Sequence, residues 1–153
     1  MSVKEKLAAL GLTLPTAAAP VAAYVPAVKS GNLIFTAGQL PVIDGKLVKE
    51  GKVGGDVTAE DAKDLAQICA LNALAAISLV ADLDQVERVL RVGGFVNCAP
   101  GFTAIPGVVN GASEFLLKVF GDVNGKHART AIGVAELPLN APVEVELLVQ
   151  LNG

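Results

Sequence analysis

Residues that bind metals or stack on bases are scarce in this sequence. Its 153 residues include no tryptophan, one tyrosine, one histidine and two cysteines. A structural zinc site needs about four nitrogen or sulfur ligands, so this inventory cannot supply one. Aromatic platforms for nucleic-acid bases are excluded for the same reason. We therefore expect no metal site, and we expect Cys69 and Cys98 to remain free thiols.

Positive charge is neither abundant nor clustered. Twelve lysine and arginine residues stand against fifteen aspartates and glutamates, which gives a net charge of −3. The cations are dispersed along the chain, so we expect no nucleic-acid partner. The first twelve residues carry Lys4, Glu5 and Lys6 and no cleavable apolar region, which favours a cytoplasmic protein.

A long uncharged run at 65–81 is the segment that most resembles a membrane span. The run is rich in alanine and directly follows the charged segment EDAKD. A membrane-spanning helix needs about 20 apolar residues, and this run is shorter. We interpret it as a buried core helix and expect no contact with a membrane.

Apolar residues, in contrast, are abundant, at 52% hydrophobic against 18% charged. A chain of this length can bury a core as one domain, which we expect to span 1–153 with an N-terminal helix and connector at 1–20. The few polar residues cannot cover the whole surface of a monomer. We therefore expect a homo-oligomer.

Apolar periodicity and turn residues predict three strands, a helix, a strand, a helix and two closing strands. Asp44-Gly45 is a strong hairpin signal. Thr58 followed by Asp61 resembles a capping box, and Gly93-Gly94 suggests a bulge. The predicted strands include 24–29, 33–37, 86–97, 130–136 and 143–150, and the predicted long helices span 58–81 and 108–120. The last two strands flank the turn LPLNAP, and a short helix is predicted within the first eleven residues.

This order of elements predicts an α+β fold. Two helices would cover one face of a mixed sheet and form a two-layer sandwich. The other face of the sheet would need a cover of its own. We expect that cover to be a neighbouring subunit.

One arginine, Arg129, begins the last apolar stretch of the chain. From 130 to 153 there is no lysine or arginine, although Glu136, Glu144 and Glu146 are present. The five N–H donors of a guanidinium cannot be removed by deprotonation and need oxygen acceptors. Arg129 therefore either pairs with Glu144 or Glu146 across strands, or binds a ligand that carries a carboxylate.

Several segments together resemble the RidA/YjgF family, also known as L-PSP or YjgF-like endoribonucleases. They are AAYVPAV around Tyr24, LIFTAGQLPV at 33–42, NALAAI in the long helix, VERVLRVGGFVN, and HARTAIGVAELPLNAPVEVELL. The last segment is the most specific, and the N-terminal helix and longer loops resemble the longer branch of the family. The resemblance implies a chorismate-mutase-like fold, a homotrimer, and ligand clefts between subunits.

The resemblance also implies a reaction, the hydrolysis of reactive 2-imino or enamine acids to 2-oxo acids and ammonia without a cofactor. By motif, Arg129 would bind the substrate carboxylate, Glu144 would help to position the attacking water, and the backbone of Ala131 would assist that water. Gly38 and Tyr24 would line the cleft from another part of the assembly. A guanidinium binds a carboxylate bidentately, so a small carboxylate-bearing substrate at a subunit interface fits this chemistry.

Two other functions stay open at this point. The protein could bind small carboxylates or metabolites through the same arginine without catalysis, and Ala37 replaces a serine of the family pattern. An endoribonuclease is less favoured, since the chain is acidic and has one histidine. A plain hairpin would place Glu144 opposite Ala135, about 20 Å along the strand from Arg129. The two side chains could then meet only through a shifted register or across a subunit boundary.

His127 and Cys98 receive no role from the sequence. A single histidine in a loop is expected to be solvated. Cys98 has no neighbouring histidine or lysine that would lower the pKa of its thiol, so we expect it to be idle.

Overall fold

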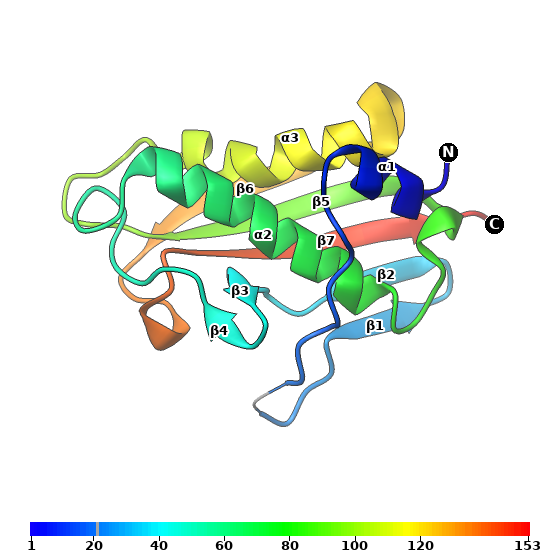
Figure 1. Ribbon diagram of the computed structural model, residues 1–153, viewed down its shortest axis with the longest axis horizontal. Coiled ribbons are helices and arrows are strands. Elements are labelled where there is room, and N and C mark those ends of the chain that lie inside the picture. The colour runs from blue at the N-terminus through cyan, green and yellow to red at the C-terminus, as the bar shows by residue number, and fades with distance from the viewer. Residues whose placement is uncertain (21) are drawn as a thin grey trace.

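Five strands form one mixed sheet in the computed structural model, which describes residues 1–20 and 22–153 (Figure 1). The strand order is β1-β2-β7-β5-β6, with β5 and β6 parallel and the other neighbours antiparallel. The strands are β1 (Ala27–Ser30), β2 (Leu33–Thr36), β5 (Val86–Asn97), β6 (Ala128–Val134) and β7 (Val143–Leu151), with β3 (Val42–Ile43) and β4 (Lys46–Leu47) in a separate hairpin. The helices are α1 (Val3–Ala9), α2 (Ala59–Ile77) and α3 (Ile105–Asn124), and the short 3-10 helices are η1 (Leu83–Gln85) and η2 (Pro138–Asn140).

The helix α2 begins where the sequence predicts because Thr58 caps it. The Thr58 hydroxyl accepts a hydrogen bond from the backbone N–H of Asp61 at 3.1 Å. The reciprocal half of the predicted capping box does not form, since the Asp61 carboxylate instead accepts from Lys49 Nζ at 2.7 Å. Most of the long apolar run is buried in the core, as predicted, although α2 ends at Ile77. Among the described residues, no helix combines the length and the apolar character that a bilayer crossing requires.

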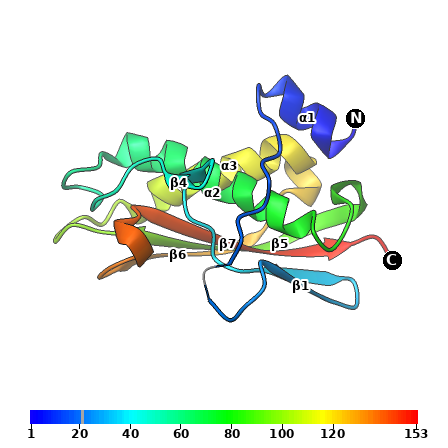
Figure 2. The ribbon, with the colours of Figure 1, turned by 60° about the horizontal axis from the view of Figure 1, so that its bottom comes forward.

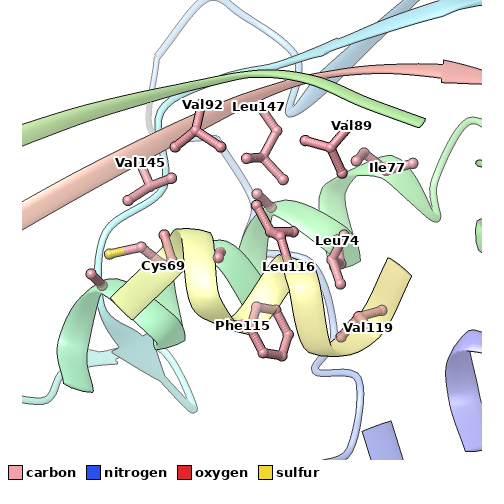
Figure 3. Close-up of a cluster of buried hydrophobic side chains, with 14 of the residues drawn as sticks. Cys69, Leu74, Ile77, Val89, Val92, Phe115, Leu116, Val119, Val145 and Leu147 are labelled. Atoms are coloured by element: carbon pink, nitrogen blue, oxygen red, sulfur yellow. The ribbon is translucent and has the colours of Figure 1, made fainter. Parts of the chain in front are cut away.

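The hydrophobic core lies between the sheet and the two long helices. Figure 2 shows α2 and α3 over one face of the sheet, which confirms the predicted α+β arrangement, with α1 packed on the outer side of the helices. Leu116 of α3 points towards Val92 and Leu147 of the sheet (Figure 3), and Leu74 of α2 and Phe115 of α3 belong to the same buried cluster. Each such burial stabilises the fold by about 1.5–3 kcal/mol, so this interface anchors the helices on the sheet.

The last two strands do not form the plain hairpin that the sequence analysis considered. The strand β6 pairs in parallel with β5, because α3 carries the chain back along the sheet between them. The strand β7 lies on the other side of β5, next to β2. The segment 135–142 therefore passes the end of β5, where Asn97 Nδ2 donates to Asn140 Oδ1 and to the Ala141 carbonyl.

The predicted bulge at Gly93-Gly94 is also wrong. Both glycines pair regularly with β7, and the irregularities of β5 lie nearer its start. Crowding explains the glycines instead. A Cβ on Gly93 would lie 2.7 Å from the Glu146 side chain, and a Cβ on Gly94 would lie 2.5 Å from the Val109 side chain. The two residues allow β5 to pack against Glu146 on one face and against α3 on the other.

Other predicted elements need smaller corrections. The strand β1 begins at Ala27, three residues later than predicted, because Pro26 has no N–H to donate to a neighbouring strand. The hairpin at Asp44-Gly45 is confirmed, and both residues adopt the left-handed conformation that a tight turn of this type requires, with φ of 51° and 78°. The helix α3 begins three residues earlier than predicted, and it continues past Phe120, its predicted end, only across a break at Gly121, where φ is 85°.

Candidate functional site

Arg129 is half-buried between β6 and α3. Its Nη1 donates to Asn110 Oδ1 at 2.7 Å and to Ser113 Oγ at 3.2 Å. Its Nη2 donates to the Pro106 carbonyl at 3.4 Å. The three acceptors follow one another at helical spacing along α3 and so face β6 together. The helix therefore fixes the position of the guanidinium.

The charge of Arg129 is not neutralised within the protomer. Its three acceptors are all uncharged, and they occupy three of its five N–H groups. The ion pairs of the described residues are Lys49–Asp61, Lys52–Glu136 and Lys63–Glu114. The predicted alternative, in which Arg129 pairs with Glu144 or Glu146 across strands, is therefore wrong. The guanidinium keeps its full charge and two N–H groups for another acceptor.

Glu144 lies on the face of the sheet that faces away from the helices. The strand β7 alternates strictly, with its valines and leucines buried at odd numbers and Glu144 and Glu146 half-buried on the opposite side. No lysine or arginine of the described residues lies within ion-pair distance of Glu144. Burial raises the pKa of Glu144 above the ordinary value of a glutamate, and the charge of Glu146 adds to the rise. Glu144 is thus a more basic carboxylate than an exposed one.

Gly38 packs directly against Glu144. The segment after β2 continues beside β7, where the backbones of Gln39 and Val145 exchange two hydrogen bonds of 2.8 and 3.0 Å. A Cβ on Gly38 would lie 2.4 Å from Glu144 Oε2. The structure therefore brings together Gly38 and Glu144, two of the residues that the sequence proposes for one cleft.

Arg129 and Ala131 form a second pair, on β6. Phe95 of β5 is aligned with Ile132 of β6 on one side and with Glu144 of β7 on the other. Arg129 is three residues along β6 from Ile132 and two strands away from β7, which places its Cα about 14 Å from that of Glu144. The two side chains also point to opposite faces of the sheet. Within one protomer they do not meet, and a shifted register does not bring them together.

Tyr24 lies apart from the pair on β6. It is 48% exposed and precedes β1, which forms one edge of the sheet, whereas Arg129 lies on β6 at the other edge. The five residues proposed from the sequence thus do not form one cluster within a single chain. A cleft that contains all of them would need more than one copy of the chain.

Sequence reasoning missed the polar side chains of α3 that hold the guanidinium. Asn110 and Ser113 are uncharged polar residues three positions apart on α3, and this spacing was the available signal. His127 was expected to be solvated, and this is wrong. The ring is half-buried, its Nε2 lies 2.8 Å from Ser113 Oγ, and its Nδ1 lies 2.6 Å from the Gly125 carbonyl.

The two cysteines are free thiols, as the sequence predicts. Burial raises the pKa of the Cys98 thiol, and the charge of Lys52 opposes this only in part. Burial also raises the pKa of Cys69, whose thiol contacts the Val143 carbonyl at 3.6 Å. Neither thiol is therefore activated as a nucleophile. No cluster of three or more potential metal ligands occurs in the described part of the chain.

Comparisons with known proteins show the family to which this fold belongs. A family model described as "YjgF/chorismate mutase-like, putative endoribonuclease" matches residues 4–151. The chain is 44% identical to Protein TCP17 of Trypanosoma cruzi, over 98% of this chain and 94% of that protein. It is 31% identical to a 2-iminobutanoate/2-iminopropanoate deaminase of Dermatophagoides farinae, over 92% and 95% of the two chains. A solved structure from Shewanella oneidensis, described as "a putative endoribonuclease", matches with a TM-score of 0.94 at 31% identity, over 99% of this chain and 100% of that one.

Proposed function

Because the chain belongs to the YjgF/chorismate mutase-like family, we propose that it is a hydrolytic deaminase of reactive 2-imino and enamine acids. One observation carries the proposal, namely a half-buried guanidinium that has only uncharged acceptors and two free N–H groups. A 2-imino acid carries the carboxylate that such a group binds. The deaminase of Dermatophagoides farinae is similar to the chain over nearly its whole length, which supports the same reaction.

In the proposed mechanism, Arg129 fixes the substrate by its carboxylate. A protonated imine is already electrophilic at its carbon, so the protein needs to supply orientation and a polarised water. Glu144 accepts a proton from this water as its oxygen bonds to the imine carbon, and the backbone beside Ala131 helps to hold the water. The carbinolamine then expels ammonia after proton return, and a 2-oxo acid remains. A general base of this kind contributes about 10²–10⁴-fold to the rate.

The proposed site lies between copies of the chain. In the described part of the chain no helix covers the sheet face that carries Glu144, and Val28, Phe35 and Ile132 on it are 52%, 48% and 44% exposed. A second copy on this face would bury these side chains, as a stable oligomer requires. The edge strand β6 of one copy would then bring Arg129 to Glu144 of the next. We propose a homotrimer in which each seam holds one such site.

A coupled assay tests the activity. An amino-acid oxidase or a dehydratase generates 2-iminopropanoate or 2-iminobutanoate, and semicarbazide traps whatever imine remains. The protein should lower the yield of semicarbazone and raise the rate of ammonia release. Unchanged trapping at high protein concentration would contradict the proposed function.

A second function, the binding of small carboxylates without catalysis, is favoured by the separation of about 14 Å between Arg129 and Glu144 within one copy. A site built from one copy could bind a carboxylate through Arg129 but would lack the base. Calorimetric titration with 2-oxobutanoate separates the two functions. Binding without any effect on imine trapping would support the receptor over the enzyme.

Mixing of two inactive variants should restore activity if each site is shared. Arg129→Ala lacks the guanidinium and Glu144→Gln lacks the base, but a mixed assembly contains seams with both residues intact. For random mixing in equal amounts, about a quarter of the seams are intact, so about a quarter of wild-type activity should return. The measurement is the imine assay after joint refolding. A mixture of Arg129→Ala with the double variant should stay inactive, and failure of the first mixture to recover would place both residues in one copy.

The pH at which kcat/KM falls on the acid side should depend on Glu146. Protonated Glu144 cannot act as a base, so kcat/KM falls as the pH drops through the pKa of Glu144, which burial and Glu146 raise. Glu146→Gln removes a negative neighbour and lowers that pKa, so the acid limb should move to lower pH while the plateau stays within about twofold. Glu87→Gln, which changes an exposed residue near the start of β5, should leave the profile in place. A shift towards higher pH would contradict the assignment of Glu144 as the base.

A further inference from the structure

The one histidine of the sequence lies in a chain of hydrogen bonds that ends at Arg129. Arg129 Nη1 contacts Ser113 Oγ at 3.2 Å, Ser113 Oγ contacts His127 Nε2 at 2.8 Å, and His127 Nδ1 contacts the Gly125 carbonyl at 2.6 Å. Gly125 is buried, and the other three residues are half-buried. The chain thus links the guanidinium to a fixed backbone group.

When the His127 ring is neutral, each hydrogen bond in this chain has one direction. The Gly125 carbonyl can only accept, so His127 donates from Nδ1, and the neutral ring keeps a lone pair on Nε2. Ser113 then donates its hydroxyl hydrogen to Nε2. A guanidinium can only donate, so Ser113 Oγ accepts from Arg129. The tautomer of His127 therefore orients the Ser113 hydroxyl so that its oxygen lone pairs face Arg129.

The acceptors on α3 also determine which edge of the guanidinium remains free. Asn110 and Ser113 take both hydrogens of Nη1, and the Pro106 carbonyl takes one hydrogen of Nη2. The remaining donors are Nε–H and one hydrogen of Nη2. Nε and Nη2 form an edge of the guanidinium that can bind a carboxylate through two parallel N–H bonds. A guanidinium that could rotate would lose this orientation.

We propose that Ser113 and His127 are positioning residues that hold Arg129 with its bidentate edge towards the substrate carboxylate. This role rests on the proposed function of Arg129 as the carboxylate-binding group. We call the hydrogen-bond chain from Gly125 through His127 and Ser113 to Arg129 the relay. The side chains that contact Nη1 of Arg129 are uncharged, so they orient the guanidinium without neutralising its charge. A carboxylate in place of Ser113 would fix the guanidinium as firmly but would compete with the ligand.

Nitrogen NMR of the imidazole tests the relay independently of any activity. The chain has one histidine, so its ring nitrogens give one unambiguous pair of signals. At mildly alkaline pH the proton should reside on Nδ1, and Nε2 should show the shift of a hydrogen-bond acceptor. Ser113→Ala should move the Nε2 signal towards that of a free lone pair. A proton on Nε2, or no response to Ser113→Ala, would overturn the proposal.

Kinetics then test the positioning role. Ser113→Ala should raise KM for the imino acid, and Kd for 2-oxobutanoate, by about tenfold, with kcat within about twofold. Ser113→Thr keeps the hydroxyl and should restore both values. His127→Phe keeps an aromatic ring but removes Nε2, and should raise KM by about threefold.

Lys118→Ala, at an exposed position of the same helix, is the matched control and should change neither constant. Equal thermal midpoints for all variants would show that folding is intact. Unchanged KM and Kd in Ser113→Ala would overturn the positioning role even if the wild type is active. A wild type that neither reacts nor binds 2-oxobutanoate would contradict the proposed function instead, and the NMR result would still decide the relay.

Discussion

Replacement of Arg129 by lysine is expected to lower kcat/KM for 2-iminobutanoate by about 100-fold or more. Lysine keeps the positive charge but loses the planar pair of donors that orients a carboxylate. It also cannot reach Pro106, Asn110 and Ser113 at once, as the guanidinium does. Two charge-assisted hydrogen bonds of about 1.5–3 kcal/mol each account for an effect of this size. The measurement is the coupled trapping assay over a range of substrate concentrations.

The control for this substitution is Arg88→Lys. Arg88 is an exposed arginine on β5 for which the described structure shows no side-chain hydrogen bond. Its replacement should leave kcat/KM within about twofold of the wild type, since exposed surface changes have small effects. If Arg129→Lys behaved like Arg88→Lys, the substrate carboxylate would have to bind elsewhere, and the proposed site would be wrong.

Replacement of Gly111 by alanine should destabilise the fold by about 3 kcal/mol or more. Gly111 lies on α3 where that helix crosses α2, and a Cβ there would lie 1.8 Å from the backbone carbonyl oxygen of Lys63. A backbone atom of a packed helix cannot move aside as a flexible side chain can, so the two helices would have to separate. Urea denaturation followed by circular dichroism measures the loss.

Gly107 supplies a matched control on the same helix. A Cβ on Gly107 would meet no atom within 4 Å, and its φ is not positive. Gly107→Ala should therefore stabilise the protein by about 0.5–1 kcal/mol through helix propensity. Equal stability of Gly111→Ala and the wild type would show that the two helices can move apart at little cost.

Local signals in the sequence predicted most elements of the fold. The strand β5 has the predicted ends, and the buried valines of β7 follow the predicted alternation. Thr58 begins α2, and Asp44-Gly45 makes a tight turn. These features depend on the chemistry of a few neighbouring residues, which a sequence displays directly.

Pairing between distant segments was not visible in the same way. Two apolar strands joined by a Leu-Pro turn are compatible both with a hairpin and with strands that flank a third one. The 20-residue helix α3 decides between them, because it returns the chain for a parallel pairing of β6 with β5. The side of the sheet on which Arg129 lies follows from that pairing. The candidate residues could therefore be identified from the sequence. The sequence did not show that Arg129 and Glu144 lie on opposite faces of the sheet.

Arg129 lies on β6 and is hydrogen-bonded to α3, whereas Glu144 lies on β7, and this separation has an evolutionary consequence. In the proposed mechanism, carboxylate binding depends on Arg129 and proton transfer on Glu144, which lie on different strands, so each could change while the other is preserved. A duplicated gene that lost Glu144 would encode a receptor with unaltered affinity for small acids. In a mixed oligomer with the parent chain, its product would still supply Arg129 to a neighbouring copy. The expression ratio of the two genes would then set the number of active sites in that oligomer.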